Sequence, residues 1–163
     1  MIVRAADLGD VAAMMAIHAA IIAAGGTTSY LVPFDIAGFV ANYTAAPLSI
    51  CCHVAVGAQR VIGFQALGTW PGLPDGWADI GTFVQPGLQR TGVGGPLFAA
   101  TSAAAHLAGI AVINAAIRAD NAPGLGYYTK RGFVEYANQP GYALADGRVV
   151  GRVLMRFDLG HAA

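Results

Sequence analysis

The feature that most constrains this chain is a glycine-bearing segment between an apolar run and an alanine-rich run. It spans residues 84–95 and reads VQPGLQRTGVGG. The apolar run 77–84 predicts a strand, and residues 96–107 predict a helix that Gly109 closes. Glycine lets a backbone turn sharply and approach a ligand, and a helix N-terminus favours anions. The segment therefore predicts a strand, loop and helix whose N–H groups hold a diphosphate.

Two other nucleotide-binding loops fit this segment poorly. It lacks the Gly-Lys-Ser/Thr ending of a P-loop. Residues 89–94 also lack the three-glycine dinucleotide fingerprint, with its acidic residue about twenty positions later. Taken alone, the segment also fits a plain turn between a strand and a helix.

The rest of the chain changes from hairpins to strand–helix units. We expect strands at 2–4, 50–56, 61–69, 110–118, from 133 onwards, and at 141–145 and 149–159. We expect Asp7 and Asp10 to supply N-cap chemistry for a helix that ends at Gly25-Gly26, and Asp35 to cap a second short helix through Tyr43. A third helix is expected from Asn121 to Arg131. This order predicts an α+β fold with a mixed, mostly antiparallel central sheet flanked by helices on both faces. With no repeat or linker, we expect a single domain over 1–163.

The composition is 56% hydrophobic and 11% charged, which raises the question of a membrane span. The candidates are 11–24, which is short for a bilayer, and 97–117, which contains several polar residues and much alanine. We expect both to be core helices. Arg4 is followed closely by Asp7, so no secretory signal is predicted and we expect a cytoplasmic protein. The formal net charge of zero argues against nucleic acid or an anionic membrane as partner.

The two cysteines, Cys51 and Cys52, are adjacent. Adjacent Cα atoms lie about 3.8 Å apart, below the usual disulfide range of about 4.4 to 6.8 Å, so both are expected to be free core thiols. His53 has no second Cys/His pair at ligand spacing, and no metal is predicted. No functional role is expected for the histidines at 18, 106 and 161.

Two motifs in this chain resemble those of the GNAT superfamily of N-acetyltransferases. The first is Gln89, Gly92 and Gly94 after the strand end Val84-Gln85-Pro86, which matches the superfamily's acetyl-CoA signature. The second is Asn121 and Tyr128, followed by Lys130, Gly132 and Phe133. The resemblance extends over nearly the whole chain and is greatest to the phosphinothricin acetyltransferase group.

The resemblance implies a set of residues that bind acetyl-CoA as cosubstrate. The N–H of Val84 is expected to hold the thioester carbonyl, and Asn121 the pantetheine, while Arg90 and Lys130 are expected near the phosphates. The full predicted set is Phe83, Val84, Gln89, Arg90, Thr91, Gly92, Val93, Gly94, Gly95, Asn121, Tyr128 and Lys130.

The same resemblance implies transfer of acetyl from acetyl-CoA to a primary amine, by direct attack in a ternary complex. Asp79 takes the superfamily's acidic position, usually Glu, and is the candidate base, acting through water. Tyr128 is the candidate acid for the leaving sulfur, and Tyr127 is expected in the core.

Thr28, Tyr30, Trp70 and Asp79 are the candidate acceptor-binding residues, and the expected acceptor is an amino acid or analogue. Related enzymes carry arginines just before the acidic strand, where this chain has 70–76 without one, and this departure argues against phosphinothricin itself. A protein or peptide N-acetyltransferase and a non-catalytic acetyl-CoA-binding module remain alternatives. The apolar composition and the resemblance together predict a homodimer.

Overall fold

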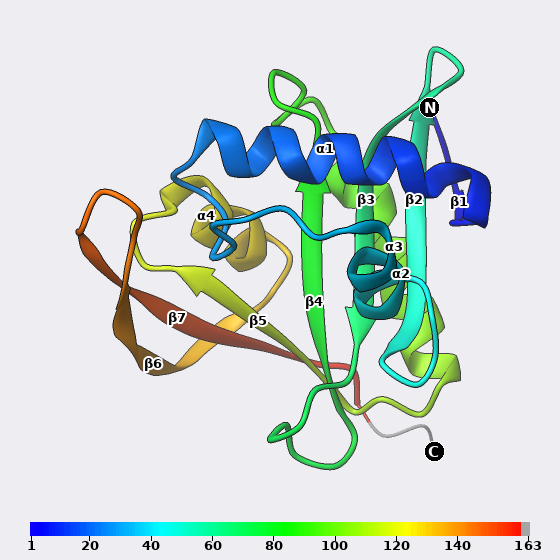
Figure 1. Cartoon of the computed structure of the whole chain (residues 1–163). Coiled ribbons are helices and arrows are strands. Elements are labelled where there is room, and N and C mark those ends of the chain that lie inside the picture. Colours follow the sequence, from blue (N-terminus) through cyan, green and yellow to red (C-terminus); the bar gives the residue numbers. More distant parts are fainter. Residues whose placement is uncertain (161–163) are drawn as a thin grey trace.

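A seven-stranded sheet organises the protein, in the strand order β1-β2-β3-β4-β5-β7-β6 (Figure 1). The computed structural model describes residues 1–160, so His161 lies outside the described residues. The strands are β1 (Ile2–Ala5), β2 (Ser49–Gly57), β3 (Arg60–Gly68), β4 (Trp77–Val84), β5 (Val112–Arg118), β6 (Val134–Ala143) and β7 (Val149–Asp158). The helices are η1 (Leu8–Asp10), α1 (Val11–Ala24), α2 (Ile36–Tyr43), α3 (Gly94–Leu107) and α4 (Ala122–Lys130).

Helices cover both faces of this sheet. Apolar side chains of α1 and α2 pack on one face with Phe64 and Phe83. On the other face, α3 and α4 contribute Phe98 and Tyr128 to a second cluster that continues into β5 and β7. The predicted α+β fold with helices on both faces is therefore confirmed, and so is the mostly antiparallel sheet, because β4 and β5 form the one parallel pair among the described strands.

Local sequence explains where the elements begin. Asp35 accepts a hydrogen bond from the N–H of Gly38 at 2.7 Å and caps α2 as predicted. Asp7 and Asp10 form a capping box at η1, the turn that leads into α1: Asp7 accepts the N–H of Gly9 at 2.8 Å, and Asp10 accepts the N–H of Asp7 at 2.9 Å. The side chain of Asp10 makes no bond to α1 itself, but it also accepts two hydrogen bonds from Arg4, at 2.6 and 2.8 Å, and so ties β1 to the start of the helix.

The last hairpin also differs from the expected pieces. β6 is one strand through Pro140, with its pairing to β7 shifted between Gln139 and Tyr142. Proline has no N–H to donate, so an irregular stretch of an outer strand accommodates it. Among residues 1–160, no helix is long and apolar enough to cross a membrane.

Candidate active site

The site lies where β4 and β5 separate. Their parallel pairing ends at Asp79 and Asn114, although both strands continue beyond that point. β4 remains paired to β3 as far as Val84, whose neighbour Gln85 donates its N–H to the carbonyl of Ile62 on β3. Backbone groups alternate sides along a strand, so the N–H of Val84 points towards β5, where no ladder partner exists. This is the geometry that the predicted role of Val84 requires.

The glycine turn follows directly from the end of β4. Gly92 has a φ of 93°, a conformation that side-chain-bearing residues rarely adopt. A Cβ on Gly94 would lie 2.5 Å from the ring of Tyr127, so this position also needs glycine. Within residues 1–160, no side chain caps the first turn of α3, which leaves its leading N–H groups available for an anion.

Several predicted coenzyme residues have side chains that are already in contact with other parts of the fold. Phe83 stacks on Phe64 at 4.6 Å, on the face away from α3. Val93 is buried under α3. Gln89 accepts the N–H of Gly87 at 2.8 Å. The other members, Arg90, Thr91, Gly95 and Lys130, also lie along the turn or the last turn of α4, and all but Gly95 are exposed.

Arg131 is a residue that the sequence reasoning missed. Its guanidinium lies 3.2 Å from the position of a Cβ on Gly95, beside the start of α3, and its Nε is buried without a hydrogen-bond partner among the described residues. It also lies over the ring of Tyr127, 5.4 Å from the centroid. Residues 127 and 131 are four apart and share a helix face, and this spacing could have revealed the pair.

A buried hydrogen-bond chain holds Tyr128 beside the gap. Its hydroxyl lies 2.9 Å from Oγ1 of Thr82, which accepts a hydrogen bond from Nε2 of Gln65 at 2.8 Å. Burial raises the pKa of the Tyr128 phenol far above its ordinary value, more than the Thr82 bond lowers it. Tyr128 is therefore protonated at neutral pH, as a proton donor must be.

Tyr127, expected in the core, has polar partners at the turn. Its hydroxyl donates to the carbonyl of Gly94 at 2.7 Å and lies 3.3 Å from Nε2 of Gln65. One amide on β3 therefore connects the glycine turn with Tyr128. Sequence reasoning missed Gln65 because an isolated glutamine in a strand carries no motif.

A second chain of hydrogen bonds orients Asp79. Nδ2 of Asn114 donates to Oδ1 of Asp79 at 2.6 Å, and the hydroxyl of Tyr136 donates to Oδ1 of Asn114 at 2.6 Å. Burial raises the pKa of Asp79 to about 6, while hydrogen bonds from Asn114 and Trp70 and the charge of Arg152 oppose the rise. A carboxylate with this pKa is mostly ionised at pH 7 and can accept a proton.

Asp79 and Tyr128 approach the gap from opposite faces of the sheet. Side chains alternate along β4: Ile80 packs with α3 and α4, whereas Phe83 packs with α1 and α2. Asp79 follows the parity of Phe83, and Thr82, the partner of Tyr128, follows that of Ile80. The candidate base and the candidate acid thus flank one gap without competing for space.

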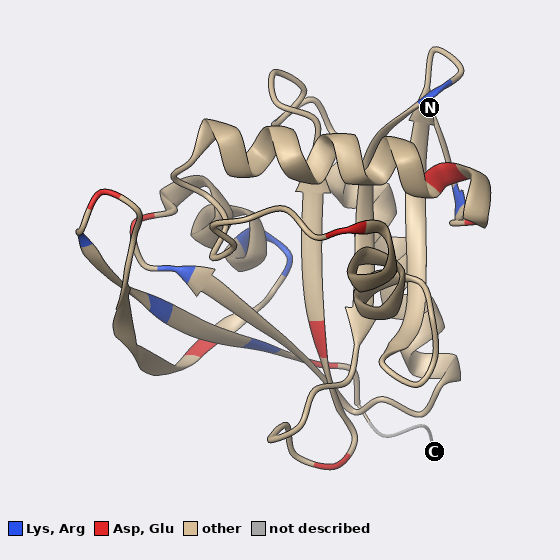
Figure 2. Cartoon of the chain, in the orientation of Figure 1, with Lys and Arg blue, Asp and Glu red and all other residues tan. Residues whose placement is uncertain are grey.

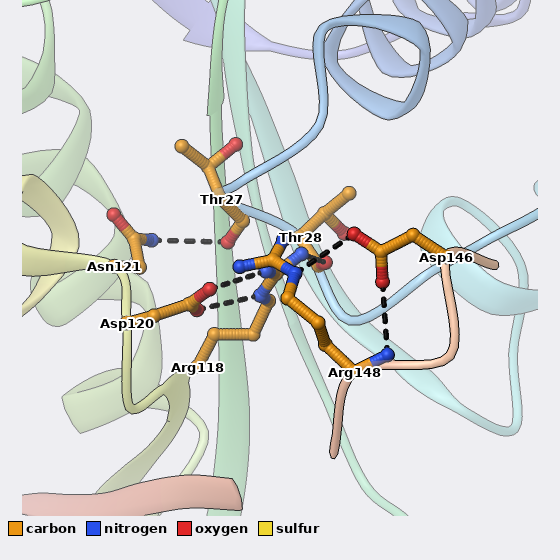
Figure 3. Close-up of polar contacts among 7 residues, drawn as sticks. All are labelled: Thr27, Thr28, Arg118, Asp120, Asn121, Asp146 and Arg148. Carbon is orange, nitrogen blue, oxygen red and sulfur yellow. Dashed lines mark hydrogen bonds and ion pairs between the residues drawn. The ribbon is translucent and has the colours of Figure 1, made fainter. Parts of the chain in front are cut away.

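The predicted acceptor loop is tied to the end of β5 (Figure 3). Nη1 of Arg118 donates to the carbonyl of Thr28 at 3.2 Å, and Nδ2 of Asn121 donates to that of Thr27 at 3.0 Å. Asn121 also caps α4 by accepting the N–H of Gly124. Its predicted contact with pantetheine remains a prediction that would use its second N–H. Tyr30 packs 5.2 Å from the ring of His18.

The remaining candidate groups play structural parts. Cys51 and Cys52 are free thiols whose pKa values burial raises to about 11 and about 12. His18 is buried among aromatic rings, which lowers its pKa to about 4. Residues 1–160 contain no group of three His, Cys, Asp or Glu that could hold a metal. An open hollow of about 600 Å³ between the end of α3 and β7 shares no residue with the site.

Residues 26–133 match the model of the acetyltransferase (GNAT) family. The match covers more than half of the chain, which therefore belongs to this family of acyltransferases. The predicted family is confirmed. A comparison with curated protein sequences gives no significant match.

Solved structures agree on the fold. A ribosomal-protein-alanine N-acetyltransferase from Brucella melitensis has a TM-score of 0.86 at 19% identity, covering 97% of this chain and 99% of that one. A phosphinothricin acetyltransferase from Sinorhizobium meliloti in complex with acetyl-CoA has a TM-score of 0.85 at 17% identity, covering 98% and 88%. A GCN5-related N-acetyltransferase from Kribbella flavida has a TM-score of 0.81 at 21% identity, covering 96% of each chain. The similar structures thus include enzymes of different acceptor classes.

Proposed function

We propose that this protein transfers the acetyl group of acetyl-CoA to the primary amine of a small molecule, an amino acid or an analogue. The observation that carries the proposal is the separation of β4 and β5, with Asp79 on one face and Tyr128 on the other. The glycine turn at the end of the same strand adds the diphosphate site. Family membership and the acetyl-CoA of the Sinorhizobium meliloti structure support the choice of coenzyme.

The residues present fit this coenzyme. The uncapped start of α3 provides backbone donors for the diphosphate, and Arg131 adds a positive charge beside Gly95. The free N–H of Val84 is suited to the thioester carbonyl, because a donor aimed at a developing negative charge stabilises the transition state. The bound coenzyme supplies the activated acetyl group.

The reaction is a direct transfer in a ternary complex. Asp79 accepts a proton from the substrate ammonium through water, and the free amine attacks the thioester carbonyl carbon. A C–N bond forms, the C–S bond breaks, and Tyr128 gives its proton to the leaving sulfur. The second proton that the nitrogen loses as it becomes an amide returns to Tyr128 through water, so the net reaction releases only the proton taken up by Asp79. Gln65 donates to Thr82, so the Thr82 hydroxyl is free to donate to Tyr128 and leave the phenol proton directed to the gap.

A thiol-release assay with mass spectrometry of the product tests the proposal. The panel contains amino acids, amino-acid analogues, polyamines and peptides with free N-termini. We expect release with amino acids and a product that carries one acetyl group. Release only with peptides would favour the protein N-acetyltransferase instead. Coenzyme binding without release would favour a non-catalytic module, and calorimetry without coenzyme binding would contradict both readings.

The proposal includes a homodimer in the cytoplasm. The edge strand β1 and the neighbouring η1 expose Ile2 at 69% and Leu8 at 80%, an apolar surface that a second copy could cover. Two free thiols fit a reducing compartment. Light scattering after size exclusion gives the mass in solution, and a monomer at micromolar concentration would contradict the dimer.

A further inference from the structure

Two arginines face each other across β5 and β7. Arg118 and Arg152 are register partners, and like charges directly opposite each other destabilise a sheet. Arg118 is neutralised, because its Nε and Nη2 donate to the carboxylate of Asp120 at 2.8 and 2.6 Å. The side chain of Arg152 makes no ion pair or hydrogen bond with any residue between 1 and 160. Its charge is therefore not neutralised by an ion pair with any of these residues.

The polar atoms around Arg152 reinforce this point. Its Nε is buried without a partner, and so is the hydroxyl of Tyr142, within the part of the chain described. The Arg152 guanidinium lies over the Tyr142 ring, 5.0 Å from the centroid, which orients it. Buried polar groups in native proteins nearly always have hydrogen-bond partners. Two adjacent donors without one are suited to binding an anionic group.

Arg152 shares a sheet face with the candidate base. Arg118, its register partner, has the same parity on β5 as Asn114, which holds Asp79. The charge of Arg152 acts on the pKa of Asp79, which it lowers. Figure 2 shows the basic segments of β5 and β7 on one side of the gap and the acidic segment of β4 on the other.

We propose that Arg152, with the hydroxyl of Tyr142, binds the carboxylate of an amino-acid substrate whose amine lies at Asp79. This inference rests on the proposed function and narrows its substrate class. An amino acid carries a cation and an anion a short distance apart, and Asp79 and Arg152 present the complementary pair. A polyamine brings a second cation towards Arg152, and a peptide N-terminus lacks the α-carboxylate, so both are disfavoured. The arginine that residues 70–76 lack is thus supplied by β7.

The test compares amino acids with their carboxamides, which keep the amine and lose the charge. We expect the wild type to prefer the acid by roughly 10- to 100-fold in kcat/KM, the range of one charge-assisted hydrogen-bonded contact. Arg152→Gln reduces this preference to below about threefold. Because Arg152 also lowers the pKa of Asp79, its loss affects both substrates alike, and the readout is the ratio of the two kcat/KM values. Arg152→Lys, which keeps the charge but not the planar fork, retains part of the preference.

Arg156→Gln is the matched control. Arg156 lies on the same strand and face, but it is 43% exposed and pairs with Asp158 at 3.5 Å. We expect Arg156→Gln to keep the preference for the acid. This control separates the general loss of one positive charge from the loss of a specific contact with the substrate. A wild type without preference, or an Arg152→Gln variant that retains it, would overturn the inference.

A binding measurement separates this inference from the proposed function. If no amine is acetylated, the proposed function fails, and calorimetry with the coenzyme-loaded protein decides the inference alone. Binding of an amino acid but not its carboxamide, lost in Arg152→Gln, supports the carboxylate site. Equal binding of both, or binding of neither, contradicts it. If Arg152→Gln is inactive on carboxamides as well, the inference is decided by Arg152→Lys, from its ratio of kcat/KM on the acid to kcat/KM on the carboxamide.

Discussion

The two faces of the gap between β4 and β5 are built differently. On the face of α3 and α4, Gln65, Thr82 and Tyr128 form a continuous buried chain of neutral groups. On the face of α1 and α2, the gap is lined by charges, a carboxylate at Asp79 and the guanidinium of Arg152, which has no ion-pair partner among residues 1–160. A neutral chain suits a ligand held mainly by backbone donors, whereas opposite charges suit selection among amines. We therefore assign coenzyme binding to the face of α3 and α4, and selection of the acceptor amine to the face of α1 and α2.

Asp79→Asn removes the negative charge from the face of α1 and α2, and we expect it to have the largest effect on activity. We expect kcat to fall by about 10³, because the general base is lost. In the wild type, kcat/KM should rise with pH through an inflection near 6, where Asp79 ionises. The folded pKa lies above the ordinary 3.8, so Asp79 makes stability fall as pH rises from about 4 to about 6.

Asp79→Asn should therefore also change the thermal stability of the protein. We expect Asp79→Asn to raise Tm at pH 7, since a buried carboxylate becomes a neutral amide of the same shape. At pH 4 the difference from the wild type should disappear. Thermal unfolding at the two pH values measures this change, and an unchanged kcat would remove Asp79 from the mechanism.

Tyr128→Phe probes the neutral chain on the opposite face. We expect turnover to fall by about 10² with the Kd for acetyl-CoA nearly unchanged, because a proton donor is lost but no binding contact. Tyr127→Phe is the matched control. Its hydroxyl holds the carbonyl of Gly94, so it should weaken coenzyme binding and spare kcat. Stopped-flow turnover and calorimetry separate the two effects, and equal behaviour of both variants would contradict this division of roles.

Gly94→Ala tests the turn from which the coenzyme face is built. The added Cβ would lie 2.5 Å from the Tyr127 ring, and the start of α3 must shift. We expect the Kd for acetyl-CoA to rise on the order of 30-fold, the loss of one or two charge-assisted bonds. Gly126→Ala is the control, because a Cβ there meets nothing within 4 Å. A wild-type Kd for Gly94→Ala would argue against the diphosphate site.

Arg131→Met gives the smallest expected effect. We expect the Kd for acetyl-CoA to rise about tenfold, a typical contribution of one charge-assisted contact, and kcat to stay the same. The effect should change little with salt, because Arg131 is half-buried and partly buried charges are screened much less than exposed ones. Lys130→Met, on the exposed side of the same turn, should change the Kd by less than about twofold. If Lys130 has the larger effect, our assignment of Arg131 is wrong.

Much of this architecture follows from local patterns. The bounds predicted for 77–84 are those of β4, and the predicted cap at Asp35 is present, because both depend on neighbours in sequence. The capping box of Asp7 and Asp10 was predictable for the same reason, whereas the pairing of Asp10 with Arg4 was not, because it joins two elements. The sequence predicted two separate strands where the structure has β6, because Pro140 interrupts the strand pattern. In the fold, pairing with β7 continues on both sides of Pro140.

The sequence alone determined the family, the glycine turn and the identities of Asp79 and Tyr128 as candidates, because these lie in short stretches whose spacing is constrained by backbone chemistry. Only the tertiary structure decided which side chains join them. Gln65 lies on β3, Arg152 on β7 and Arg131 at the C-cap of α4, and each meets residues at the gap that are distant in sequence. Hydrogen bonds and charges act over a few ångströms in space, and no spacing along the chain records that distance.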